Sequence, residues 1–212
     1  MMEQPYRNHI IENFFVDHFL ERRNADEGFV LEETDIGAET LLHFKVCGSD
    51  SLALLNVDKK NTLFDFFKSD RTLSLNKRVD HIVLEECESN QWVAHLIEMK
   101  TSISSAEKWV EIKGKFRASY LFVQALCAML HMELTAVRMY TTYENETLDY
   151  MPENMIARRP MVGVKVVDPK QEWSGGQFVL RFGNDCLLPF AHTPILVTRN
   201  KDNILEGEFQ CA

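Results

Sequence analysis

The sequence predicts an α/β protein with a mixed α+β sheet, and three observations point to this class. Apolar residues at helical spacing mark two long segments, whereas β-branched and aromatic residues fill several shorter runs. Of the 212 residues, 45% are hydrophobic and 26% are charged, which is typical of a folded globular chain rather than a disordered one. No apolar run approaches the ~18 residues of a membrane-spanning helix. We therefore expect one compact domain with a full hydrophobic core.

The first expected element is an amphipathic helix over about residues 6–23. Ile11, Phe14 and Phe15 follow helical spacing and form an apolar stripe, and Asn24 ends the pattern. Short runs with strand character follow, separated by turn-forming residues. These strands are expected at residues 28–32, 40–46 and 51–57.

Two further runs, at residues 78–85 and 92–100, predict a β-hairpin. Glu88, Ser89 and Asn90 lie between them and supply the turn.

A long helix should follow the hairpin, from about Ser105 to Met132. Ser104 and Glu107 fit an S-x-x-E capping box at its start. Its apolar stripe steps by three and four residues and comprises Trp109, Ile112, Phe116, Tyr120, Val123, Cys127 and Leu130. A strand is expected after it, at residues 134–142.

The character of the chain changes beyond about residue 144, where prolines and glycines become frequent. We interpret residues 1–144 as the core and residues 145–212 as a β-rich extension packed on it, so that the two form one compact unit. Strands are expected in the extension at residues 161–167, 177–182 and 195–199.

The charge balance and the cysteines limit the classes of function. There are 23 basic and 32 acidic residues, a net charge of −9, which argues against binding nucleic acid through bulk charge but leaves a local basic groove open. The five cysteines form no CxxC pair and the seven histidines are scattered, so a structural zinc site is not expected. Reduced thiols and the lack of a secretory signal pattern favour a cytoplasmic protein.

The stretch RVDHIVLEECESNQWVAHLIEMK holds the residues with the clearest chemistry. Residues two apart in a strand share a face, so Glu98 and Lys100 point the same way, and Asp80 on the preceding strand can converge with them in a hairpin. Two carboxylates on otherwise apolar strands are costly unless a cation neutralises them. Oxygen ligands of this kind suit Mg²⁺ or Mn²⁺, with Lys100 placed beside the ion.

This arrangement resembles the PD-(D/E)XK nuclease superfamily, which has a restriction-endonuclease-like core of helix, β-meander, helix and strand. The matching residues are Asp80, Glu98 and Lys100, with Val79 in place of the family's proline, and the likeness covers about residues 5–142. The resemblance implies a nuclease that hydrolyses DNA or RNA with a metal-activated water. The family often adds an acidic residue from the first helix, for which Glu12 is the first candidate and Glu21 the next. Glu32, on the edge of the expected strand at residues 28–32, is a third candidate.

The long helix offers a candidate surface for the nucleic acid. Lys113, Arg117 and Gln124 share one helical face, and the resemblance implies that such residues lie near the scissile phosphate. Between Met99 and Tyr140 the sequence contains six basic residues and three acidic ones, so this segment is locally basic.

Two other functions stay open from the sequence. For the nuclease, the acidic net charge favours a narrow groove or a protein partner that delivers the substrate. In the first of the other two functions, the chain has this fold but acts as an inactive module that binds a protein or nucleic acid, with the β-rich extension as an interface, for example of a homodimer. In the second, it is an unrelated α/β protein in which Asp80, Glu98 and Lys100 form only an ion pair at a strand edge.

Overall fold

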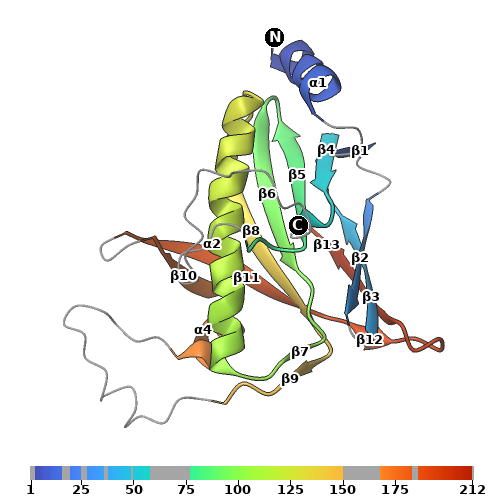
Figure 1. The fold of residues 1–212 in the computed structure, drawn as a ribbon, viewed down its shortest axis with the longest axis vertical. Helices are drawn as coiled ribbons and strands as arrows, with labels where there is room; N and C mark the ends of the chain where they lie inside the picture. The colour runs from blue at the N-terminus through green and yellow to red at the C-terminus, as the bar shows by residue number, and fades with distance from the viewer. Residues whose placement is uncertain are drawn as a thin grey trace.

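The computed structural model describes residues 3–15, 20–24, 28–35, 38–48, 50–57, 77–149, 168–182 and 186–211. They form a mixed α/β fold in three layers (Figure 1). The central layer is a seven-stranded sheet in the order β1-β4-β5-β6-β8-β11-β10, and a second sheet has the order β12-β13-β3-β2. The long helix α2 (Ala106–Met129) lies on one face of the central sheet and the second sheet packs on the other.

The central sheet is built around a hairpin, as the sequence predicts. Strands β5 (His81–Glu88) and β6 (Gln91–Glu98) pair antiparallel, with the turn at Ser89 and Asn90. Asn90 has φ 57°, a left-handed conformation that asparagine tolerates better than most residues. The outer strands on this side are β4 (Asp50–Leu54) and β1 (Glu21–Asn24).

Helix α2 connects β6 to β8 (Glu133–Tyr143), which pairs parallel with β6 as a helical crossover requires. The helix begins one residue later than the sequence predicts. Ser105, not Ser104, is the N-cap, and its hydroxyl accepts a hydrogen bond from the Lys108 amide. Between β6 and α2 the chain forms β7 (Ser102–Ile103), which pairs with β9 (Asn145–Glu146).

The C-terminal part of the chain contributes strands to both sheets. Strand β11 (Leu187–Leu196) pairs parallel with β8, and β10 (Gln177–Arg181) forms the edge beside it. Strand β13 (Leu205–Gln210) lies between β12 (Thr198–Arg199) and β3 (Ala38–Lys45). A short helix, α4 (Pro169–Gly175), flanks α2, and β2 (Phe29–Asp35) completes the second sheet.

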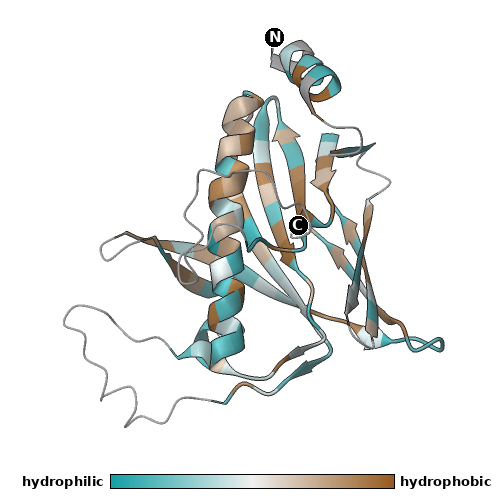
Figure 2. Ribbon diagram, viewed as in Figure 1, coloured by the Kyte–Doolittle hydropathy of each residue, from teal (hydrophilic) through white to brown (hydrophobic). Residues whose placement is uncertain are grey.

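Two hydrophobic cores lie on opposite faces of the central sheet, and Figure 2 shows the apolar residues along its strands and α2. The α2 side holds Leu84, Leu96 and Trp109, whereas Phe44, Val83 and Ile97 fill the space between the sheets. The alternation of side chains along β5 and β6 sends each residue to one core or the other.

Three sequence predictions need correction or lie outside the described residues. Helix α1 (Glu3–Phe14) ends well before Arg23, because Arg22 and Arg23 pair with Leu52 and Ser51 as part of β1. The strand expected from residue 195 begins at Leu187. The strand expected at residues 161–167 lies outside the described residues.

No helix in the described segments is both long enough and apolar enough to cross a membrane.

Candidate active site

Asp80 and Glu98 come together on the α2 face of the central sheet. Asp80 lies directly before β5 and Glu98 is the last residue of β6, and both side chains are buried. A lysine from α2 joins them, since the Lys115 Nζ lies 2.6 Å from Glu98 Oε1 and 3.6 Å from Asp80 Oδ1. The two carboxylates therefore face the same ammonium group.

Lys100 also reaches this cluster. Its Nζ lies 2.7 Å from Glu98 Oε1 and 3.0 Å from the carbonyl oxygen of Met99. Its backbone is fixed by Thr142, whose hydroxyl accepts from the Lys100 amide at 2.9 Å and donates to the Lys100 carbonyl at 3.1 Å. Because its side chain keeps about a fifth of its surface exposed, Lys100 connects the buried carboxylates to solvent.

The backbone around Asp80 holds its carboxylate in a fixed position. Asp80 Oδ2 accepts a hydrogen bond of 2.6 Å from the Met99 amide, which links the start of β5 to the end of β6. The preceding residue, Val79, donates its amide to the Ser119 hydroxyl on α2 at 2.9 Å. One carboxylate oxygen of Asp80 is thus used by the scaffold, and the other faces Lys115.

Glu98 has the most strongly altered electrostatics of the cluster. Burial, reinforced by the neighbouring Asp80 carboxylate, raises the pKa of Glu98 to about 7, although Lys100 and Lys115 oppose the shift. Its second oxygen, Oε2, is buried and has no hydrogen-bond partner within the described part of the chain. A buried carboxylate oxygen without a partner is costly, and a cation bound there would satisfy it. The hard oxygen donors of Asp80 and Glu98 therefore fit a Mg²⁺-type ion.

The predicted nucleic-acid surface on α2 is largely occupied by neighbouring elements. Lys113 forms an ion pair of 2.7 Å with Glu172 on α4, and the same Glu172 oxygen accepts from the Trp109 indole. Arg117 donates to the carbonyl oxygen of Arg181 at 3.2 Å. The amide of Gln124 donates to the Tyr120 hydroxyl and is exposed.

The acidic residues proposed to complete the site are not brought to it. Glu12 is exposed on α1, and α1 docks at the Trp92 end of β6, where Arg7 stacks on the Trp92 ring. Trp92 is six residues from Glu98, or about 20 Å along the strand. Glu21 pairs with Arg23 on the edge strand β1, and Glu32 is exposed on β2 in the second sheet.

Lys115 is the site residue that the sequence reasoning missed. The sequence does carry a signal for it, because Ile112, Lys115, Ser119 and Phe122 recur at intervals of three and four residues. Such spacing places Lys115 at the edge of the buried stripe. A lysine in that position requires a buried anion as partner.

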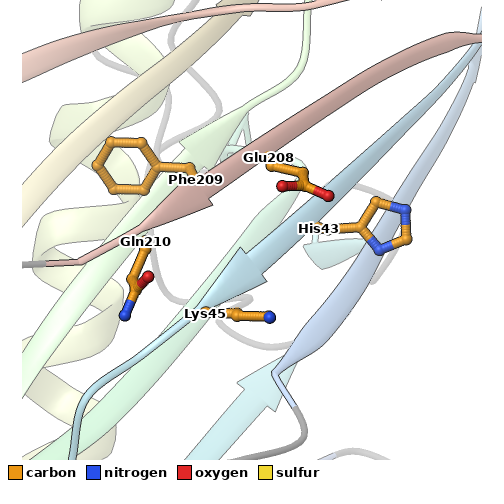
Figure 3. Close-up of a pocket in the computed structure, with 5 residues that line it drawn as sticks. All are labelled: His43, Lys45, Glu208, Phe209 and Gln210. Atoms are coloured by element: carbon orange, nitrogen blue, oxygen red, sulfur yellow. The ribbon is translucent and has the colours of Figure 1, made fainter.

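A shallow pocket of about 250 Å³ lies elsewhere, on the outer face of the second sheet (Figure 3). The side chains of His43 and Lys45 on β3 and those of Glu208 and Gln210 on β13 surround it, whereas Phe209 points to the other side of β13. It is separated from Asp80 and Glu98 by the central sheet. The cluster on the α2 face is the better candidate for catalysis, because it brings two buried carboxylates into contact with two lysines.

No protein-family model, curated protein or solved structure matches this chain.

Proposed function

We propose that this protein is a metal-dependent phosphodiesterase that hydrolyses DNA or RNA, as the resemblance to the PD-(D/E)XK nucleases implies. The observation that carries the proposal is the meeting of two buried carboxylates and two lysines at the end of β6, with one Glu98 oxygen left without a partner among the described residues. Paired carboxylates can bind a metal ion, and a lysine beside them adds positive charge. Both stabilise the dispersed negative charge of the transition state in phosphoryl transfer.

Asp80 and Glu98 would hold Mg²⁺ or Mn²⁺. When bound, such an ion makes a water molecule more acidic and stabilises negative charge on a phosphoryl oxygen. The pKa of Glu98 near 7 means that a cation and a proton compete for its carboxylate, so binding of the ion is favoured as pH rises.

Lys100 and Lys115 would have different roles in the reaction. Lys100, which is partly exposed, is placed to offset charge on the scissile phosphate or to orient the attacking water. Lys115 is more buried and touches both carboxylates, so it positions them and limits their repulsion. Nucleic acid would approach from the side on which Lys100 is open, with a homodimer or a delivering protein as a further partner of this acidic chain.

The cluster also supports a second candidate, an inactive module of the same arrangement that binds a protein or nucleic acid. Lys100 and Lys115 already neutralise the two carboxylates without any metal. In this cluster the positive charges of the two lysines cancel the negative charges of the two carboxylates, so a metal ion is not required to neutralise it.

Cleavage assays with variants of the cluster test the proposal. We expect wild-type protein with Mg²⁺ to cut at least one of plasmid, linear duplex, single-stranded DNA and RNA. Lys100→Ala should lower the rate by about 10²–10³-fold, because stabilisation of developing charge is lost, while binding of Mn²⁺ persists. Asp80→Ala should lose both cleavage and Mn²⁺ binding.

The matched control is Lys201→Ala, which removes an exposed lysine far along the chain from this cluster. Its rate should equal that of wild type. Equal Mn²⁺ binding by wild type and Asp80→Ala would remove the metal site, and absence of cleavage on all four substrates would favour the binding module.

A further inference from the structure

A second polar cluster lies on the opposite face of the central sheet, in the core between the two sheets. It consists of Glu85, His95, Tyr140 and Cys211, which come from β5, β6, β8 and the residue after β13. All four side chains are buried. The proposed nuclease site uses none of them, so any role of this cluster is independent of that proposal.

The hydrogen bonds in this cluster fix which nitrogen of His95 is available. The Nε2 atom lies 2.8 Å from Glu85 Oε2, and that hydrogen bond holds the pKa of Glu85 below its usual value. Burial lowers the pKa of His95, so the ring is neutral and its Nε2–H donates to the Glu85 carboxylate. The lone pair of Nδ1 is then left facing the interior.

Two protic groups compete for that single lone pair. The Tyr140 hydroxyl lies 3.0 Å from Nδ1, and the Cys211 Sγ lies 3.5 Å from it. The same two groups also hydrogen bond to each other, at 3.8 Å. One ring nitrogen accepts one linear hydrogen bond, so at most one of these donors is satisfied by His95.

We propose that His95 Nδ1 and Cys211 Sγ bind a thiophilic divalent cation of the Zn²⁺ type, with the Tyr140 hydroxyl as a third ligand. Bonds of about 2.3 Å to sulfur and 2.0–2.1 Å to nitrogen place tetrahedral ligands about 3.6 Å apart, close to the 3.5 Å between these atoms. The corresponding separations for an oxygen ligand are about 3.3 and 3.5 Å, within a few tenths of an ångström of those of Tyr140. Imidazole with thiolate favours zinc over magnesium.

Glu85 hydrogen bonds to His95 and does not bind the ion. It contacts Nε2, on the far side of the ring from Nδ1, so one ion cannot be bound by both Glu85 and Nδ1. A carboxylate on the second nitrogen of a metal-binding histidine fixes the orientation of the ring. Glu85 is itself held by the Cys47 amide, which donates to its Oε1 at 2.7 Å.

The fold delivers Cys211 to this place through the C-terminal strand. Figure 3 shows Phe209 on the side of β13 away from His43 and Lys45, and its ring stacks on Phe44 between the sheets. Cys211 is two residues further and its amide continues the ladder by donating to the Lys45 carbonyl, so its side chain enters the same core. The three ligands thus come from separate parts of the chain, so no short sequence motif such as CxxC indicates this metal site.

The charges balance when the ion is bound. Burial raises the pKa of the Cys211 thiol to about 12, so without a cation the thiol is protonated. Binding forms the metal–sulfur bond, breaks the S–H bond and releases one proton to solvent for each ion bound. The thiolate and the Glu85 carboxylate then offset the two positive charges of the ion, next to the Arg138 guanidinium, whose charge also acts on His95, Tyr140 and Cys211.

Cobalt substitution tests this site. The full chain refolded with one equivalent of Co²⁺ should show a thiolate-to-cobalt charge-transfer band and release of one proton. The band should disappear in Cys211→Ser, whereas Glu85→Gln should keep it and bind about 10–100-fold more weakly. Cys186→Ser, which changes an exposed cysteine, and Asp80→Ala, which changes the other face of the sheet, should leave the band intact.

X-ray absorption of the zinc-loaded wild type covers the case in which Cys211→Ser does not fold. One sulfur at about 2.3 Å among nitrogen and oxygen ligands supports the site. A shell without sulfur, no charge-transfer band in wild type, or a band that survives in folded Cys211→Ser overturns it.

Discussion

A single side chain, Glu98, ties the stability of the fold to pH. Its pKa is about 7 in the fold against a usual 4.5, because burial and Asp80 disfavour the charged form. Between these two values the folded protein keeps a proton that the unfolded chain releases. The contribution of Glu98 to stability is therefore fully present below about pH 4.5 and is lost as pH rises through 7.

Glu98→Gln should remove this dependence. As pH rises from 4 to 8, the free energy of unfolding of the variant should gain up to about 3 kcal/mol relative to wild type. Urea denaturation of both proteins across that range measures the difference. The lowered pKa values of His95 and His192 act in both proteins alike and cancel.

The exposed Glu208→Gln serves as the control and should follow wild type at every pH. Parallel curves for Glu98→Gln and wild type would show that the pKa of Glu98 is not raised in the fold, because Lys100 and Lys115 offset the effects of burial and of Asp80.

At the scale of the element, α2 supplies Lys115 to the candidate active site and contains one weak position. Gly114 lies in the middle of the helix, and a Cβ built there meets no atom within 4 Å. Alanine costs less conformational entropy than glycine in a helix interior. Gly114→Ala should therefore raise the free energy of unfolding by about 0.5–1 kcal/mol, measured by urea denaturation.

Gly176→Ala is the matched control with the opposite expected sign. Gly176 ends α4 with φ 68°, a left-handed conformation that a side chain disfavours by about 1 kcal/mol or more. A loss of stability in Gly114→Ala would show that residue 114 has a neighbour that the helix geometry does not account for.

The elements that the sequence predicts best are those with strong local signals. The β5–β6 hairpin has alternating side chains and a turn residue suited to positive φ, and α2 has a cap and a long apolar stripe. The predicted boundary of α1 is wrong because the pairing of β1 with β4 depends on residues about thirty positions away. Such long-range pairing overrides a local helical pattern.

The candidate site is predictable to the same degree. The face shared by Glu98 and Lys100 follows from the two-residue period of a strand, and the structure places Asp80 beside them. The spacing in α2 places Lys115 at the edge of the buried stripe, but its two carboxylate partners depend on how the helix packs on the sheet. The place of Cys211 depends on β13 joining the second sheet. Neither the packing of the helix nor the strand order can be inferred from local spacing.

At the scale of the whole molecule, the central sheet separates two hydrophobic cores. Both the N-terminal and the C-terminal parts of the chain contribute strands to the central sheet and to the second sheet. Strands β11 and β13 lie close together in sequence, yet one extends the central sheet and the other lies inside the second sheet. The described residues between 145 and 211 therefore contribute side chains to both cores. This architecture predicts that the two cores unfold together.

The tryptophans allow this coupling to be measured, because Trp92, Trp109 and Trp173 all lie in the core on the α2 side. Leu42→Ala removes a fully buried side chain from the other core, on β3, and should cost about 2–5 kcal/mol. If the molecule is one cooperative unit, tryptophan fluorescence and far-UV circular dichroism should shift to the same lower urea midpoint. Lys45→Ala, an exposed change three residues along the same strand, should leave both midpoints in place. A fluorescence midpoint that stays at the wild-type value while circular dichroism shows an earlier transition would mean that the second sheet unfolds alone. In that case the sheet bearing Cys211 would be a separable layer, and its cohesion would depend on the contacts between the sheets rather than on the α2 core.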